Sequence, residues 1–179
     1  DQTMTGSTFV VAQDSSPFGS GWGISGVDRL VSIAAAGADP AGMLRVLGSG
    51  GHLFYTGTST FTSEDGDNGT LTKATGGGVT TYTYATPDGQ ATTYDTNGYQ
   101  KKYTSADGLA SIAYGHDGSN RLASVTATDG TLTTLTYTGS SSVGIATGGR
   151  TTTLTLASGD LTKVTNPDGG LHTLTYSSH

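Results

Sequence analysis

Carboxylates are the side chains in this sequence that most readily suggest chemistry. The chain has 179 residues, of which 14 are Asp or Glu, and a glycoside hydrolase needs two such groups flanking the bond that it cleaves. Most of the acids, however, lie in short Gly-, Asn- and Pro-rich segments, where an Asp side chain accepts hydrogen bonds from nearby backbone N–H groups and forms a turn. We therefore expect a protein that is not an enzyme, with turn formers at Asp39, Asp65, Asp67, Asp88, Asp107, Asp117, Asp129, Asp160 and Asp168.

A Ca²⁺ site is the next alternative. Residues 64–69 (EDGDNG) carry Asp65 and Asp67, whose hard oxygen atoms suit this ion. The loop lacks the full spaced pattern of a calcium-binding loop, so a solvated acidic hairpin loop is the favoured interpretation, and no cofactor is expected. The 4 histidines share no metal-ligand spacing. No G-x-S-x-G motif is present, and no helical segment follows the glycine run 76–78 to hold a phosphate.

Aromatic side chains are the third candidate group. Six tyrosines are predicted to share one face of a sheet: Tyr82, Tyr84, Tyr94, Tyr114, Tyr137 and Tyr176. If that face is covered, which is the favoured interpretation, they form a core. If it is open, Tyr94, Tyr114, Tyr137 and Tyr176 form a strip suited to sugars or to the apolar surface of a partner. Trp22 has the same two readings, as a core anchor or as a platform for a sugar ring.

Short strands would position these side chains. The 29 glycines and the many threonines disfavour helix, and a glycine recurs roughly every 20 residues, at Gly69, Gly89, Gly108, Gly130, Gly149 and Gly169. Apolar residues two apart follow these glycines and would share one face: Ile112 and Tyr114, Leu135 and Tyr137, Leu154 and Leu156, Leu174 and Tyr176. Return strands are expected at 99–104, 122–126, 143–146 and 161–165. The prediction is an all-β, antiparallel meander of β-hairpin repeats.

Two regions are predicted along the chain. Residues 1–42 form an N-terminal strand and a Gly- and aromatic-rich corner that lead into the repeats, and residues 43–179 form the hairpin repeats. In the first region we expect strands at 8–12 and 30–36, with the corner at 15–30 between them. The second region opens with a hairpin of residues 43–47 and 52–55, followed by a strand at 58–62.

Composition limits the partners. The formal net charge is −6 and the chain has only 8 Lys and Arg, so neither nucleic acid nor an anionic membrane surface is an expected partner. The absence of cysteine excludes disulfides and thiolate metal sites. No apolar run approaches the ~18 residues of a membrane-spanning helix. The chain begins at Asp1 without a charged and then apolar leader, which is typical of a mature or excised fragment.

The repeats resemble the Rhs/YD-repeat family of bacterial surface and toxin-delivery proteins, whose unit is roughly Y-D-x-x-G-R-L, a spacer and a V-T-x-P-D-G-like turn. Residues 94–98 (YDTNG) match the head of that unit, with Tyr99 in place of the usual Arg. A second copy is matched by Tyr114, Arg121, Leu122, Val125, Asp129 and Gly130, and half of a later copy by Leu161, Val164, Thr165, Pro167, Asp168 and Gly169. The corner 16–22 followed by residues 28–30 (DRL) is similar to the segment that precedes such repeats.

The resemblance implies part of a hollow β-sheet shell from a secreted or cell-surface bacterial protein. The family's self-cleavage motif has no counterpart in this sequence, so neither cleavage nor toxicity is expected. Our first hypothesis is a non-enzymatic structural module that engages further repeats, other protein segments or a second copy through its sheet edges. The alternative is a carbohydrate-binding or adhesion module that uses the tyrosine strip and Trp22.

Overall fold

The computed structural model describes residues 10–177. In that range the chain forms 15 strands and no helix, so no helix there is long and apolar enough to cross a membrane. A 4-stranded antiparallel sheet comprises β1 (Arg29–Ile33), β2 (Gly42–Val46), β3 (His52–Thr56) and β4 (Thr62–Ser63). An 11-stranded sheet follows in chain order: β5 (Thr70–Gly76), β6 (Val79–Ala85), β7 (Ala91–Tyr94), β8 (Gln100–Thr104), β9 (Ser111–His116), β10 (Leu122–Thr126), β11 (Leu132–Thr138), β12 (Ser142–Thr147), β13 (Arg150–Ala157), β14 (Asp160–Thr165) and β15 (Leu171–Thr173). The predicted all-β hairpin meander is confirmed.

The hairpin turns depend on aspartate side chains and on residues with positive φ. The Asp95 carboxylate accepts hydrogen bonds from two backbone N–H groups of its turn, and Gly98 closes that turn with a φ of 81°. Asp117 accepts a similar pair one repeat later, where Asn120 takes the place of glycine with a φ of 61°. Equivalent backbone bonds are accepted by Asp107, Asp129 and Asp168. For Asp107, Asp117, Asp129 and Asp168 the prediction of turn formers is confirmed, and Asp95 forms its turn in the same way.

Strand alternation builds the core on one face of the long sheet. Tyr137 lies opposite Val143, which in turn lies opposite Leu154, and threonines occupy the other face. The buried residues form two clusters. The first joins the two sheets through Leu30, Met43, Tyr55, Leu71, Tyr84 and Tyr94. The second lies along the long sheet and contains Tyr114, Leu122, Leu135 and Val143.

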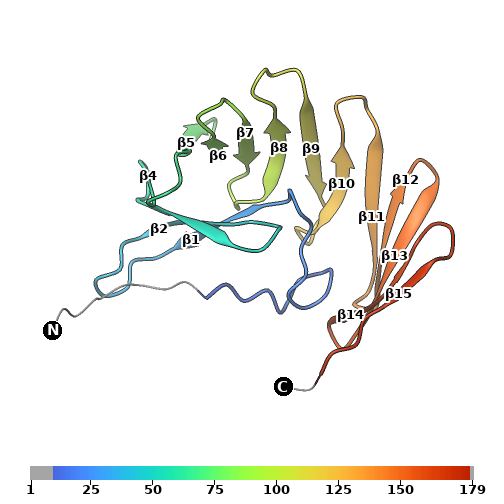
Figure 1. Cartoon of the computed structure of the whole chain (residues 1–179). Coiled ribbons are helices and arrows are strands. Elements are labelled where there is room, and N and C mark those ends of the chain that lie inside the picture. Colours follow the sequence, from blue (N-terminus) through green and yellow to red (C-terminus); the bar gives the residue numbers. More distant parts are fainter. Residues whose placement is uncertain (1–9, 178–179) are drawn as a thin grey trace.

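The long sheet curves into an arch that runs from β5 to β15, and the small sheet and the N-terminal segment lie on its concave side (Figure 1). We call residues 15–28 the N-terminal strap. The backbone N–H of Ser20 donates to the Gly159 carbonyl at 2.8 Å, and strap side chains pack against the second cluster, namely Phe18, Ile24 and Val27. Because the strap crosses this face, the chain itself covers much of the apolar surface of its long sheet.

Several predicted boundaries are wrong. The expected strand at 8–12 lies partly outside the described residues, and its described part, 10–12, is not a strand. The strand expected at 58–62 is reduced to β4, because Gly57, at a φ of 123°, turns the chain there. The strand expected at 30–36 ends at Ile33, since Ala36 and Asp39 bond to each other in a tight turn. Leu174 and Tyr176 follow the end of β15.

Candidate functional site

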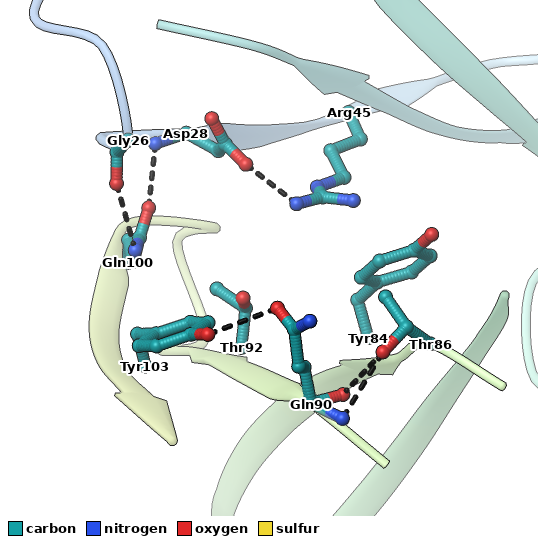
Figure 2. Close-up of a pocket in the computed structure, with 9 residues that line it drawn as sticks. All are labelled: Gly26, Asp28, Arg45, Tyr84, Thr86, Gln90, Thr92, Gln100 and Tyr103. Atoms are coloured by element: carbon teal, nitrogen blue, oxygen red, sulfur yellow. Dashed lines mark hydrogen bonds and ion pairs between the residues drawn. The ribbon is translucent and has the colours of Figure 1, made fainter. Parts of the chain in front are cut away.

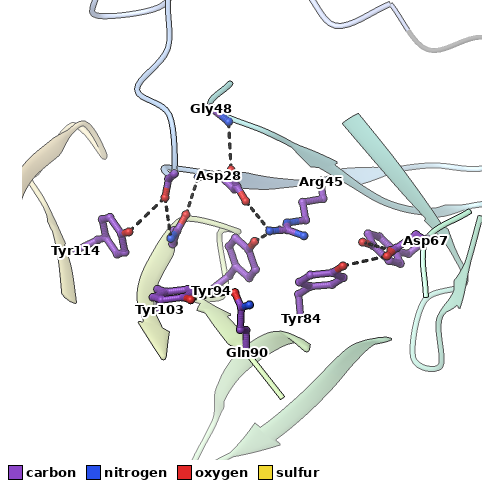
Figure 3. Close-up of polar contacts among 12 residues, drawn as sticks. Asp28, Arg45, Gly48, Asp67, Tyr84, Gln90, Tyr94, Tyr103 and Tyr114 are labelled. Atoms are coloured by element: carbon purple, nitrogen blue, oxygen red, sulfur yellow. Dashed lines mark hydrogen bonds and ion pairs between the residues drawn. The ribbon is translucent and has the colours of Figure 1, made fainter. Parts of the chain in front are cut away.

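Polar side chains gather where the strap meets both sheets. Figure 3 shows them between β1 and β2 on one side and β7 and β8 on the other. We call four of them the junction network: Asp28, Arg45, Tyr94 and Gln100. Buried polar groups in folded proteins are almost always hydrogen-bonded, so their partners show what each one does.

Asp28 and Arg45 form the ion pair of the junction network. Arg45 Nη2 lies 2.6 Å from Asp28 Oδ2, and both side chains are largely buried. Arg45 Nε donates to the Tyr94 hydroxyl at 3.0 Å, and the guanidinium carbon lies 3.9 Å from the centre of the Tyr84 ring, in a cation–π contact. The other Asp28 oxygen accepts the backbone N–H of Gly48 at 3.1 Å. These contacts join the end of the strap to β2 and β7.

Gln100 holds the strap backbone to β8. Its Nε2 donates to the Gly26 carbonyl at 3.1 Å, and its Oε1 accepts the Asp28 backbone N–H at 2.5 Å. The Tyr114 hydroxyl donates to the same Gly26 carbonyl at 3.2 Å. Gln100 is only 2% exposed, and its amide pairs with one backbone acceptor and one backbone donor of the strap.

A β-bulge places Gln100 on the inner face. Tyr94 pairs with Gln100, whereas Thr93 pairs with Lys102, so the register shifts between these pairs and Lys101 is the extra residue. Gln100 directly precedes the bulge of its return strand, and at the same position later return strands have a buried leucine, Leu122 in β10 and Leu161 in β14. An amide therefore replaces a leucine at the point where the strap passes.

The Asp67 carboxylate is hydrogen-bonded to two tyrosine hydroxyls. Its carboxylate accepts the Tyr55 hydroxyl at 2.7 Å and the Tyr84 hydroxyl at 2.9 Å, and the Gly69 backbone N–H at 2.9 Å. Partial burial opposes ionisation, but the hydrogen bonds from these donors outweigh it and lower the pKa of Asp67 below its ordinary value. Asp65 is exposed in the same loop. A Ca²⁺ ion at Asp65 and Asp67 would have to compete with both hydroxyls, and the described residues contain no group of three or more His, Cys, Asp or Glu placed to hold a metal.

A cavity of about 190 Å³, lined mainly by residues with polar groups, lies beside the junction network. Figure 2 shows its lining: Gly26, Asp28, Arg45, Tyr84, Thr86, Gln90, Thr92, Gln100 and Tyr103. The Tyr103 hydroxyl donates to Gln90 Oε1 at 2.9 Å across its floor. Thr92 is 6% exposed, and no side-chain hydrogen bond of its hydroxyl is found within residues 10–177. Most polar side chains that line the cavity are thus hydrogen-bonded within the protein, whereas the Thr92 hydroxyl is available to a ligand.

The predicted aromatic strip is not one exposed surface. Tyr94 has no exposed area and Tyr114 is also buried, while Tyr137 is half-buried and donates to the Leu122 carbonyl. Trp22 and Tyr176 are 42% and 48% exposed, and Trp22 Nε1 donates to the Tyr176 hydroxyl at 3.1 Å. The strip is divided because the strap and the small sheet cover its middle, so of these five aromatic residues Trp22 and Tyr176 are the exposed ones.

Sequence reasoning missed the junction network apart from Tyr94. Asp28 and Arg45 carry no spacing that distinguishes them, but Gln100 and Thr92 did leave a signal. Thr92 lies two residues before Tyr94, at a position where later repeats have Ile112 and Leu135. Two polar residues in positions that other repeats fill with apolar ones mark the place where the sheet contacts something other than a hydrophobic core.

Comparisons with protein-family models and with curated proteins identify no relative of this chain. No protein-family model matches the chain, and no curated protein matches it. The resemblance to the Rhs/YD-repeat family therefore depends on the residues quoted above.

Proposed function

We propose that this chain is a non-enzymatic structural module: part of a β-sheet shell or scaffold in a secreted or cell-surface bacterial protein similar to the Rhs/YD-repeat family. The cellular location and the shell are inferred from the resemblance to that family. The edges of the sheet are the surfaces through which it engages further repeats, other protein segments or a second copy of itself.

One observation carries the proposal: the polar side chains of the junction network are used to attach the chain to itself. The Asp28–Arg45 ion pair joins the strap to β2, and Arg45 also donates to Tyr94. The Gln100 side chain donates to the strap backbone, and the Asp67 carboxylate accepts hydrogen bonds from two tyrosines. These bonds stabilise a curved sheet whose concave side carries the small sheet and the strap (Figure 1), which suits a load-bearing or enclosing role.

The two edges of the long sheet differ. Beside β5 lie β4 and the loop before it, with the Ser63 hydroxyl donating to the Gly69 carbonyl at 2.6 Å and Lys73 Nζ to the Thr58 carbonyl at 3.2 Å. β15 pairs only with β14, and its three residues are exposed. A strand edge with unpaired N–H and C=O groups is a template for another strand, so β15 is the edge that we expect to engage a partner.

The test compares two exposed leucines at the same position of the repeat. Leu171 lies two residues after Gly169 in the edge strand β15, and Leu132 lies two residues after Gly130 in β11, which has neighbours on both sides. Association is measured by analytical ultracentrifugation across a range of concentrations. Leu171→Lys is expected to weaken it, because a lysine on an edge strand disfavours strand addition, whereas Leu132→Lys should leave it unchanged.

Two results would contradict the proposal. One is a wild-type chain that stays monomeric at every concentration and captures no strand peptide that copies β14 or β15. The other is equal loss of association in both lysine variants, which would place the contact on the outer face of the sheet and not at its edge.

The Trp22–Tyr176 pair supports a second candidate function, carbohydrate binding or adhesion. Both rings keep exposed surface and are held together by a hydrogen bond, and exposed aromatic rings suit the apolar faces of sugars. Binding to a glycan array that is lost in Trp22→Ala and retained in Tyr99→Ala would favour this function. Absence of glycan binding by the wild-type chain would remove it.

A further inference from the structure

The cavity beside the junction network contains hydrogen-bonding capacity that the fold does not use. The Thr92 hydroxyl has no side-chain hydrogen bond within residues 10–177, and it lies in register between Tyr84 of β6 and Tyr103 of β8. Arg45 has five N–H donors, and its bonds to Asp28 and Tyr94 use two of them. Donors at the wall of a cavity point to an occupant that accepts hydrogen bonds.

The charge of the lining selects a neutral occupant. Asp28 and Arg45 neutralise each other at 2.6 Å, and the other polar side chains of the lining are amides and hydroxyls. An anion would have to displace Asp28 from Arg45, and a cation would be repelled by the guanidinium. An apolar occupant would leave the Thr92 hydroxyl and the guanidinium donors buried without partners, which costs free energy.

The size of the cavity limits the occupant further. At about 190 Å³ it is much larger than the space that one water needs, roughly 10–15 Å³, and smaller than the ~300–1,000 Å³ of pockets for drug-sized ligands. Its lining offers an aromatic ring, Tyr103, on the side opposite the carboxylate of Asp28 and the guanidinium of Arg45 (Figure 2). The carboxylate can accept a hydrogen bond from one hydroxyl of a diol, and the guanidinium can donate one to the neighbouring hydroxyl.

We propose that this cavity is a binding site for a neutral, hydroxyl-rich ligand the size of one monosaccharide. Its binding residues are Asp28, Arg45, Thr92 and Tyr103. The site is separate from the Trp22–Tyr176 pair and does not depend on the scaffold function. Because Asp28 and Arg45 come from the strap and β2, while Thr92 and Tyr103 come from β7 and β8, the ligand joins the two sheets and stabilises the folded chain in proportion to its concentration.

The repeat pattern supports the site independently of the cavity volume. Thr92 and Gln100 both replace residues that are apolar in later repeats, such as Ile112 and Leu122. Gln100 is explained by the strap backbone that it binds. The strap gives Thr92 no hydrogen bond, and the ligand accounts for its hydroxyl.

The test uses four probes, glucose, galactose, mannose and N-acetylglucosamine, with ligand-detected NMR and thermal denaturation of the full chain. We expect at least one probe to bind saturably and to raise the Tm. Thr92→Val removes one hydrogen bond and should weaken that binding by about two- to tenfold, while Thr92→Ser should restore it. The control is Thr93→Val, because Thr93 lies on the opposite face of β7 and should bind as the wild type does.

Three results would overturn the proposal. The first is that no probe binds the folded wild-type chain with a Kd below about 10 mM, which corresponds to less than roughly 3 kcal/mol of binding free energy. The second is equal binding by Thr92→Val and the wild type. The third is binding lost in Trp22→Ala and retained in Thr92→Val, which would assign the sugar to the exposed aromatic pair.

Discussion

Gln100 and Gly26 are 74 residues apart in the chain, and the side-chain amide of Gln100 donates to the carbonyl of Gly26 at 3.1 Å. The same side chain accepts the backbone N–H of Asp28. An amide can satisfy a donor and an acceptor together, which neither a leucine nor a carboxylate can do at neutral pH. This residue therefore decides whether the strap can dock without leaving unpaired backbone groups.

Gln100→Leu should lower the free energy of unfolding by about 1–3 kcal/mol, because it leaves the partly buried Asp28 N–H and the Gly26 carbonyl without the amide that pairs with them. Chemical denaturation measures the change. Gln90→Leu is the control, since Gln90 is an amide at a half-buried position in a turn, and it should lose less. A Gln100→Leu variant as stable as the wild type would show that strap docking does not need the amide.

Gly98→Ala should destabilise the chain more than Gly108→Ala. Both glycines have positive φ, 81° and 72°, so both alanines carry the left-handed penalty of about 1–2 kcal/mol. A Cβ on Gly98 would also overlap the Leu30 carbonyl, whereas Gly108 faces open space. Denaturation midpoints compare the two variants, and equal losses would contradict the close approach of β1 to the turn at Gly98.

Asp67 should contribute to stability in a pH-dependent way. Its pKa lies below the ordinary value of 3.8 in the folded chain, despite partial burial, because Tyr55, the Gly69 N–H and Tyr84 donate to it. A carboxyl with a lowered folded-state pKa stabilises the fold above its unfolded pKa, and that contribution is lost as the pH falls through the folded-state pKa. The difference in stability between wild type and Asp67→Asn should therefore shrink below about pH 4. Asp65→Asn, an exposed change in the same loop, should show no such trend.

Buried tyrosines should make the fold sensitive to alkali. Burial raises the pKa of Tyr94 above its ordinary value of 10.0, and burial raises the pKa of Tyr137 to about 12. A tyrosine with a raised folded-state pKa binds its proton more tightly when folded, so its contribution to stability is complete below pH 10 and is lost as the pH rises above that value. Tyrosinate absorbance should rise in two steps, exposed residues first and the buried ones with unfolding. A single rise in tyrosinate absorbance near pH 10, with the fold intact, would contradict the burial of Tyr94 and Tyr137.

Local chemistry made the hairpins predictable. The return strand expected at 122–126 is β10 residue for residue, because the turns on both sides of it combine an Asp with a positive-φ residue, Asp117 with Asn120 and Asp129 with Gly130. The strap was not predictable in the same way, since the contact of Gly26 with Gln100 joins distant segments and follows no period. The bulge at Lys101 adds to the difficulty: counting by twos back from Tyr103 puts Lys101 and not Gln100 on the inner face.

The strap also has a consequence for the order in which the protein can fold during synthesis. Each hairpin of the long sheet pairs neighbours in sequence and can form soon after it leaves the ribosome. Strap residues leave the ribosome well before their partners do: Ser20 bonds to Gly159, and Trp22 bonds to Tyr176. Phe18, Ile24 and Val27 therefore stay uncovered while the strands of the arch are made, and their docking is a late step in the folding of this segment.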